Sequence, residues 1–407
     1  MTSRPAILYL VHRVPYPPDK GDRIRSFHLL RFLQQHANVH LAAFTDEETT
    51  EETREVLNNY CSRVTIVRLG KWTRWLHALR FLLSGRTVSE GAHSSARMVR
   101  LLRDWAKETR YDAILASASS LVEYLGMPEF AERRRVVDLV DVDSEKWFDY
   151  SRGHPWPKSW LYRTEAERLR KVEKRLARDM AALTLVSDPE VDLFRDFCSQ
   201  GGVHTATNGV DLDYFQASSS VSDPKLCVFV GALDYFPNVD GVCWFAVEVW
   251  PRIRERDPEA KFQIVGRNPV PEVRRLGAIP GIEVVGQVPD VRPYLDAAAL
   301  ALAPLQIARG LQNKVLEALA MKKAVVASPK AIAAIRVQPG EHLLTASEED
   351  EWAQAVVSLL SDPVRRCQLG DTGRRFVEDN HDWDTCLRPF GELLGLAPEV
   401  QHTQAIS

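Results

Sequence analysis

The stretch RGLQNKVLEALAMKKAVVAS, residues 309–328, places charged and amide side chains at the start of an apolar helix that leads into a buried strand. The spacing predicts a helix that begins near Leu311, with Asn313 and Glu317 one turn apart on the same face. The apolar run Ala324–Val326 after it predicts a strand. A helix that feeds directly into such a strand is typical of a parallel sheet flanked by helices.

The same alternation continues in both directions along the chain. Six strands are predicted in the first half: Ala6–Val11, Val39–Ala43, Val64–Val67, Ala113–Leu115, Val136–Val140 and Leu183–Val186. Five are predicted in the second half: Leu226–Val230, Phe262–Val265, Ile282–Val285, Ala299–Leu302 and Ala324–Val326. Three helices are predicted to follow: Trp352–Leu360, Val364–Val377 and Thr385–Leu394. The pattern predicts an α/β fold with two Rossmann-like, doubly wound domains in tandem.

A length of 407 residues is too great for one compact core, which also favours two domains. The turn-rich segment HTATNGVDLDYF and the serine cluster Ser218–Ser220 separate the two halves. We expect an N-terminal domain over residues 1–207, a C-terminal domain over 208–380, and a crossover helix and tail over 381–407. Ligands bind outside the carboxyl ends of parallel strands, so two such sheets facing each other would form a cleft.

The composition excludes several classes of protein. Hydrophobic residues make up 45% and charged residues 26%, which is typical of a soluble globular chain. The formal net charge is -3, so the chain lacks the basic excess that binding to nucleic acid requires. The six cysteines form no C-x-x-C pair, which argues against a zinc site or a disulfide framework. With no signal peptide and no long apolar run, we expect a cytoplasmic protein.

Glycines follow three predicted strands of the second half, in the segments VGALDYFPN, IVGRNP and VVGQVPD. Glycine lets the backbone approach a phosphate, and the helix start near Pro237 or Asn238 offers free N–H groups. We therefore take Gly231, Gly266 and the adjacent Arg267 as candidates for nucleotide binding. A tight turn explains a single glycine of this kind equally well.

The opening stretch supplies the polar side chains that a nucleotide requires. A ribose needs a carboxylate to accept hydrogen bonds from its hydroxyls, and a diphosphate needs cations or free N–H groups. Glu317 and Lys314 fit these roles, with Gln312 and Asn313 beside them. The alternative is that early amide and acidic residues only cap the helix, but the apolar residues around Glu317 favour a binding role.

In the first half, the segment YPPDKGDRIRSFHLLRFL places Gly21 at a helix start directly after the first strand. Lys20, Arg23 and Arg25 lie close in sequence, which suits an anionic group. A solvated helix start is the alternative, with Asp19 and Asp22 neutralising part of the charge.

Three carboxylates, Asp138, Asp141 and Asp143, lie where a strand gives way to a helix in VVDLVDVDSEKW. Carboxylates there can orient a sugar hydroxyl, act as a base or bind a divalent metal, and the metal is the weakest of these options. Alternatively, Asp143 or Ser144 is the helix N-cap.

The segment KWTRWLHALRFLLSGR, residues 71–86, mixes cations with Trp72, Trp75 and leucines. A basic amphipathic helix with tryptophans can lie in a lipid headgroup layer, so we consider contact with the inner face of the membrane. A helix that packs its tryptophans on the core is the alternative.

Taken together, these motifs resemble the retaining glycosyltransferases of the GT-B fold, family 4-like. TNGVDLDYF, FVGALDYFPNVDGVCWF, FQIVGRNP, IEVVGQVPDVRPYL and ARGLQNKVLEALAMKKAVVAS follow in the order found in that family. More narrowly, HRVPYPPDKGDRIRSFHLL, DLVDVDSEKW and RGLQNKVLEALAM resemble sugar transferases found with exopolysaccharide and PEP-CTERM/exosortase systems.

The resemblance implies transfer of a hexose-type sugar from a nucleoside diphosphate sugar to a hydroxyl of a lipid-linked or glycan acceptor, with retention and without a metal cofactor. Glu317 matches the second glutamate of the family's Glu-x7-Glu motif, which binds the donor ribose. Gly21 matches a glycine loop facing the donor phosphates or acceptor, and Val288 a segment beside the base. Gly310 and Leu311 complete the candidate donor-binding stretch.

The chain departs from the family pattern at several positions. Arg309 stands where the first glutamate is expected, and Ala232 and Asn238 replace the arginine and lysine after the second domain's first strand. We infer that Arg309 and Lys314 stabilise the charge of the leaving diphosphate. The usual histidine of the first domain is not evident, which leaves Asp141 and Asp143 as its candidate substitutes. Two alternatives stay open: a nucleotide-sugar epimerase or hydrolase, and a non-catalytic nucleotide-sugar binding or scaffold protein.

Overall fold

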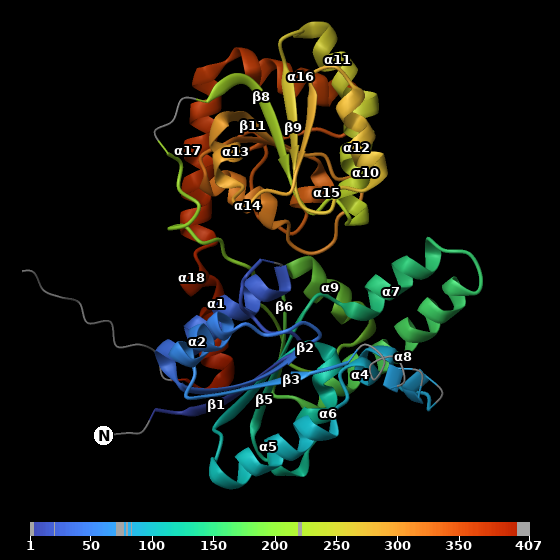
Figure 1. The fold of residues 1–407 in the computed structure, drawn as a ribbon, viewed down its shortest axis with the longest axis vertical. Helices are drawn as coiled ribbons and strands as arrows, with labels where there is room; N and C mark the ends of the chain where they lie inside the picture. Colours follow the sequence, from blue (N-terminus) through green and yellow to red (C-terminus); the bar gives the residue numbers. More distant parts are fainter. Residues whose placement is uncertain are drawn as a thin grey trace, which may run out of the picture. The chain divides into compact units, whose positions relative to one another are not determined.

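The computed structural model describes residues 4–19, 21–70, 77–78, 80–82, 84–218 and 222–396. The chain divides into two compact units, which we call unit 1 (Met1–Ala206 with Leu387–Ser407) and unit 2 (Thr207–Cys386). Each unit is a parallel β-sheet with helices packed against it (Figure 1). No helix within the described ranges combines the length and the apolarity needed to cross a membrane.

The sheet of unit 1 has the strand order β3-β2-β1-β4-β5-β6-β7, and its strand pairs are parallel. Its strands are β1 Ala6–Val11, β2 Asn38–Thr45, β3 Arg63–Arg68, β4 Ala113–Ser117, β5 Arg134–Val140, β6 Ala182–Leu185 and β7 Val203–Thr205. The central strands are buried on both faces, which explains why they are continuous apolar runs.

Helices of unit 1 connect these strands and cover both faces of the sheet. They are α1 Gly21–His36, α2 Glu51–Tyr60, α4 Val88–Ala92, α5 Ala96–Glu108, α6 Val122–Leu125, α7 Asp143–Arg152, α8 Lys158–Asp179 and α9 Asp188–Phe197, with short 3-10 turns at Ser119–Leu121 and Pro128–Phe130. Hydroxyl caps begin several of them: the Thr50 side chain accepts from Thr53 N to start α2, and Thr87 and Glu90 form a capping box at α4.

The sheet of unit 2 has the strand order β10-β9-β8-β11-β12-β13, again parallel. Its strands are β8 Asp223–Val230, β9 Lys261–Val265, β10 Ile282–Gly286, β11 Ala298–Ala303, β12 Ala324–Ala327 and β13 Leu344–Thr345. Its helices are α10 Phe236–Trp244, α11 Trp250–Arg256, α12 Pro271–Arg275, α13 Arg292–Ala297, α14 Asn313–Ala320, α15 Pro329–Ile332, α16 Glu349–Ser361 and α17 Pro363–Asn380. A π-helical turn, Phe245–Val249, joins α10 to α11. The last helix, α18 Trp383–Leu394, begins in unit 2 and continues into unit 1.

Each unit has its own apolar core, and every strand that the sequence predicts is present. The edge strands β7 and β13 are additional. They contain three and two residues, too few for a hydrophobic period to be visible in the sequence. Of the segment 71–86, the tryptophans and most of the first ten residues lie outside the described ranges.

Two predicted helix starts are wrong. Helix α14 begins at Asn313 instead of near Leu311, because Gly310 has a φ of +63° and breaks the helical backbone before Gln312. Helix α7 has Val142 as its N-cap, not Asp143 or Ser144, and the Val142 side chain makes no capping hydrogen bond.

Candidate active site

The best candidate site of unit 2 lies at the point where the strand order reverses. Strands β8 and β11 are neighbours, and the chain continues from β8 to β9 on one side and from β11 to β12 on the other. The loops that leave their carboxyl ends lead to α10 and α14. In open parallel sheets, ligands bind at this switch point.

Lys314, in the first turn of α14, links the two loops. Its Nζ donates to Asn238 Oδ1 at 2.8 Å and to Gln312 Oε1 at 3.2 Å. Asn238 Nδ2 in turn donates to Ala232 O at 2.9 Å, which fixes the orientation of the amide. Burial lowers the pKa of Lys314 to about 8, and the negative charge of Glu317 acts in the opposite direction. The ammonium of Lys314 is thus partly desolvated, and its hydrogen-bond acceptors are neutral amides. Such a cation is suited to bind an anionic ligand.

Glu317 lies one turn further along α14. No side-chain or backbone donor in the described part of the chain makes a hydrogen bond to its carboxylate, although the side chain is half-buried. Burial raises its pKa to about 7, and the charge of Lys314 limits the rise. A half-buried carboxylate without hydrogen bonds is costly for the free protein and gains most from hydroxyl donors of a ligand.

The N-terminus of α14 is open, because the N-cap Gln312 makes no capping hydrogen bond through its side chain. Instead, Gln312 Nε2 donates to Arg309 O at 3.1 Å, which holds the preceding turn. Uncapped N–H groups and the helix dipole favour a negative group at this end.

The linker segment that enters unit 2 also supports α14. Asn208 Nδ2 donates to Asn313 Oδ1 at 3.3 Å, and His381 Nδ1 lies 2.9 Å from Asn208 O. A carbonyl oxygen can only accept, so His381 carries its proton on Nδ1. Burial lowers the pKa of His381, which favours the neutral ring. In the sequence, Asn208 is visible only as part of a turn, and neither residue is among the predicted site residues.

The glycines after β8 and β9 have a packing role. A Cβ on Gly266 would lie 1.7 Å from Gly231 O, and a Cβ on Gly231 would lie 2.9 Å from Asn238 Nδ2. These glycines let the two loops touch, and they bring Asn238 next to Lys314.

The other predicted donor-side residues also lie in unit 2. Arg309, Gly310, Leu311, Arg267 and Val288 are all half-buried in unit 2. Leu311 and Val288 pack against the apolar core, and Arg267 O accepts a hydrogen bond from Leu233 N at 2.9 Å.

Unit 1 has a corresponding switch point between β1 and β4, and there the structure brings together residues that the sequence does not link. His12 Nδ1 lies 3.1 Å from Ser117 O, which makes Nδ1 the donor, and its Nε2 lies 3.5 Å from Asp22 Oδ2. Arg13 also donates to Asp22 at 2.7 Å. Although burial acts to raise it, the pKa of Asp22 is lowered by the His12 hydrogen bond and the Arg13 charge.

Asp143 and Asp141 follow the next strand, β5. Ser119 Oγ donates to Asp143 Oδ2 at 2.7 Å, and Lys146 Nζ lies 3.9 Å from Asp141 Oδ2. Burial raises the pKa of Asp143, while the Ser119 hydrogen bond and the charge of Lys146 act to lower it. Asp143 is therefore a carboxyl that can hold a proton above the usual pH range of an aspartate.

The prediction that the arginines near Gly21 are available to an anionic group is wrong. Arg25 is 1% exposed and forms a two-point ion pair with Asp138, both contacts at 2.8 Å. Arg23 is neutralised by Asp19 at 3.2 Å and Glu47 at 3.1 Å. Asp138 is thus a structural partner of Arg25 and not a free carboxylate.

Gly21 itself begins α1, and a Cβ added to it would have nothing within 4 Å. The start of this helix is therefore open around the glycine, whereas Lys20 lies outside the described residues.

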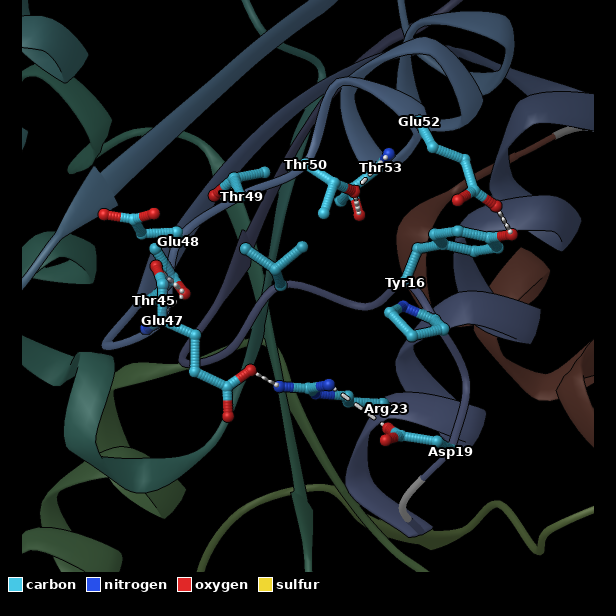
Figure 2. Close-up of a pocket in the computed structure, with 12 residues that line it drawn as sticks. Tyr16, Asp19, Arg23, Thr45, Glu47, Glu48, Thr49, Thr50, Glu52 and Thr53 are labelled. Carbon is cyan, nitrogen blue, oxygen red and sulfur yellow. Dashed lines mark hydrogen bonds and ion pairs between the residues drawn. The ribbon is translucent and has the colours of Figure 1, made fainter. Parts of the chain in front are cut away.

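A pocket of about 340 Å³ opens between the start of α1 and the loop from β2 to α2. Figure 2 shows carboxylates and threonines around it, with Tyr16 and Arg23 on one side. Tyr16 donates to Glu52 Oε1 at 3.1 Å, and this bond raises the pKa of Tyr16. Its lining has four carboxylates, Asp19, Glu47, Glu48 and Glu52, against one arginine, so it suits a ligand rich in hydroxyl donors.

Within the described ranges, no group of three or more His, Cys, Asp or Glu side chains is placed to hold a metal ion.

Comparisons with known proteins agree with this architecture. Residues 224–362 match a sequence-family model described as "Glycosyl transferases group 1". No curated protein is detectably similar in sequence.

Solved structures match almost the whole chain. Sucrose-phosphate synthase from Thermosynechococcus elongatus is 17% identical with a TM-score of 0.69, covering 96% of this chain and 98% of that one. HepE from Anabaena, in complex with UDP and glucose, is 16% identical with a TM-score of 0.66, covering 96% and 99%. TarM from S. aureus, in complex with fondaparinux, alpha-GlcNAc-glycerol and UDP, is 10% identical with a TM-score of 0.68, covering 96% and 99%. The fold is therefore that of the GT-B glycosyltransferases, as the sequence predicts.

Proposed function

We propose that the protein is a glycosyltransferase that moves a hexose-type sugar from a nucleoside diphosphate sugar to a hydroxyl acceptor, with retention at the anomeric carbon. One observation carries the proposal: at the switch point of unit 2, the Glu317 carboxylate has no hydrogen bond among the described residues, and Lys314 lies on the same helix. The family match over residues 224–362 and the UDP complex of HepE support the same assignment.

In this proposal, Glu317 accepts hydrogen bonds from the two ribose hydroxyls. The ammonium of Lys314, the open N-terminus of α14 and Arg309 bind the diphosphate and stabilise the charge that grows on it as the glycosidic bond breaks. Gly231, Gly266 and Asn238 keep the loops close to this charge, and Arg267 and Val288 border the nucleotide. These cations and N–H groups supply the positive charge that a divalent ion would otherwise provide, so we propose that no metal is required.

Unit 1 binds the acceptor. The carboxylates of the pocket in Figure 2 accept hydrogen bonds from its hydroxyls. The carboxyl groups of Asp141 and Asp143 and the imidazole of His12 lie at the carboxyl edge of the sheet. There they orient the reacting hydroxyl of the acceptor. The leaving diphosphate takes the proton of that hydroxyl, so no strong enzymic base is needed.

The resemblance to exopolysaccharide-associated transferases supports a role in the assembly of cell-surface glycans, on a lipid-linked or glycan acceptor at the inner face of the membrane. TarM, a protein of similar fold, is named in complex with alpha-GlcNAc-glycerol and fondaparinux, which are both sugar-containing ligands.

A two-step experiment tests the proposal. First, a panel of UDP- and GDP-sugars is screened for the one that raises the melting temperature, and the screen is repeated with Lys314→Ala and Glu317→Gln. We expect the shift to be strongly reduced in both variants while circular dichroism stays unchanged. A wild-type shift retained in full by both variants would disprove the site.

In the second step, the donor is incubated with and without an oligosaccharide or polyprenyl-phosphate-sugar acceptor. Transfer that depends on the acceptor, with the donor's anomeric configuration kept in the product by NMR, supports the proposal. Complete conversion of the donor without any acceptor would instead identify an epimerase or hydrolase. A chelator should leave the rate unchanged.

A further inference from the structure

The α7–α8 hairpin of unit 1 presents large apolar side chains to solvent. Trp156 and Trp160, at the turn and at the start of α8, are 79% and 60% exposed. Figure 1 shows the two helices side by side, with the turn between them at the edge of the unit. Large apolar side chains exposed near one another are candidates for an interaction surface.

Ring contacts and buried hydrogen bonds join the two arms of the hairpin that carries these tryptophans. An aromatic cluster joins its two arms, with ring centroids of Trp147 and Tyr162 5.3 Å apart and those of His154 and Tyr162 5.2 Å apart. At its base, the buried Glu173 of α8 accepts hydrogen bonds from the backbone N (2.9 Å) and Oγ (2.5 Å) of Ser144 of α7. The two exposed tryptophans take no part in this cluster, so the packing that joins the two arms leaves them exposed.

Cations lie around the tryptophans, and two of them are paired with acidic side chains: Arg152 with Asp149 at 2.8 Å and Arg163 with Glu167 at 3.1 Å. Residues 150–164 contain no acidic side chain, but they include Arg152, Lys158 and Arg163. The chain as a whole has a net charge of -3, so this concentration of cations is local.

A basic pocket of about 280 Å³ lies on the same helix. It is lined by Arg86, Arg168, Lys171 and Arg175, against a single carboxylate, Glu90. Glu90 is already paired with Arg86 at 3.0 Å and with Arg175 at 3.7 Å, so the pocket keeps a net positive charge. In the described part of the chain, Lys171 makes no hydrogen bond or ion pair, and its ammonium is available to a ligand.

Helical spacing places the pocket and the tryptophans on one surface. Trp160, Lys171 and Arg175 are separated by 11 and 4 residues, which are close to whole turns, so they share a face of α8. Along the helix, Trp160 and Lys171 are about 16 Å apart. A planar partner that contacts this face can therefore reach both at once.

We propose that the exposed face of the α7–α8 hairpin, with its basic pocket, is a docking surface for an anionic lipid bilayer. The indole rings of Trp156 and Trp160 enter the interfacial layer, where aromatic side chains with an N–H donor are favoured. Lys158 contacts the anionic headgroups, and the pocket at Lys171 binds a lipid phosphate. The helix lies on the membrane and does not cross it. Of the described part of residues 71–86, Gly85 and Arg86 line its pocket, and the surface does not depend on the donor site.

The test is flotation of the full-length protein with vesicles of phosphatidylcholine alone or of phosphatidylcholine and phosphatidylglycerol in equal parts. We expect the wild type to float only with the anionic vesicles and to be released by high salt. Trp156→Ala/Trp160→Ala should weaken vesicle binding by at least about tenfold, because two apolar side chains no longer enter the interface. Lys171→Glu, which replaces attraction by repulsion, should weaken it by roughly thirtyfold.

Matched controls lie elsewhere on the chain. Arg97→Glu changes the same charge on α5 of unit 1, and Val247→Ala/Val364→Ala removes exposed apolar side chains from unit 2. Both should float like the wild type. Each variant is also tested for its melting temperature and for the nucleotide-induced shift, which should not change.

The proposal is overturned by no flotation of the wild type, by equal flotation of wild type and hairpin variants, or by equal binding to neutral and anionic vesicles. Inorganic phosphate that protects Lys171 from chemical modification while flotation fails would assign the pocket to a soluble anion instead, and would also overturn it. Because the readout is vesicle binding, a failed transfer assay leaves this test unaffected.

Discussion

Glu317 and Lys314 make the behaviour of the candidate donor site depend on pH within a narrow range. The pKa of Glu317 is raised to about 7 by burial, and that of Lys314 is lowered to about 8, so both groups titrate near neutrality. The Glu317 carboxyl becomes ionised, and so accepts hydrogen bonds through both oxygens, as the pH rises through about 7, whereas Lys314 loses its positive charge as the pH rises through about 8.

We therefore expect nucleotide affinity to follow a bell-shaped curve with its maximum between these two values. Isothermal titration calorimetry with UDP or GDP across pH 6–9 measures the curve. Glu317→Gln should remove the acidic limb and Lys314→Arg the basic limb. An affinity that stays constant over this range would show that neither group contacts the nucleotide.

Glu317 should also lower the stability of the free protein. Its folded-state pKa lies above the value of 4.5 for an unperturbed glutamate, so the stability present below pH 4.5 is lost as the pH rises through about 7. Glu317→Gln removes this cost and should raise the melting temperature at pH 8 by a few degrees, but leave it nearly unchanged at pH 4.5. The same variant should bind nucleotide more weakly. Differential scanning calorimetry at both pH values checks the sign, and an equal or lower melting temperature at pH 8 would contradict it.

The sequence identifies part of this site but not all of it. Glu317 and Lys314 are visible because charged residues stand inside an apolar helix. His12 and Asp22, by contrast, become significant only through Ser117, which is 105 residues from His12 in the chain. Arg25 and Asp138 look like free functional groups in the sequence, because no local pattern indicates a pairing across 113 residues.

At the scale of elements, contact between loops restricts the glycines of unit 2. The position of Gly266 has no space for a side chain, since a Cβ there would lie 1.7 Å from Gly231 O, a backbone atom that cannot rotate away. Gly266→Ala should therefore destabilise unit 2 by about 3 kcal/mol or more. Gly21→Ala, with nothing within 4 Å, should change stability by less than about 1 kcal/mol. Thermal unfolding of both variants makes the comparison, and similar losses would refute the steric argument.

Strands and helices are predictable wherever a buried run is long enough to show its period. Strand β1, for example, coincides with its predicted bounds, because the apolar run Ala6–Val11 is buried along most of its length. The predicted start of α14 is displaced because the backbone of Gly310, with its positive φ, decides it, and this is invisible in the hydrophobic pattern. The predicted cap of α7 is wrong because the buried Glu173, from α8, takes the backbone and side chain of Ser144.

At the scale of the whole molecule, the two units have separate cores, and the candidate donor cluster belongs entirely to unit 2. We expect calorimetry to resolve a transition of unit 2 that the matching nucleotide stabilises. At a hundred times its dissociation constant, the ligand adds about 2.7 kcal/mol. For a unit of this size that amounts to roughly 5–10 °C. A shift of unit 1 alone would place the nucleotide in the other half.

Helix α18 makes unit 1 discontinuous in the chain. Leu387, Phe390 and Leu394 of this helix are buried, and Arg134 Nε donates to Leu393 O at 2.6 Å, so the last turns complete a core that begins at β1. Unit 2 is in effect an insertion into unit 1. During synthesis, unit 2 can fold as soon as its own residues have emerged, whereas unit 1 must wait for α18. A nascent chain arrested just after Cys386 would thus display a complete unit 2 joined to a unit 1 that still lacks its last helical turns.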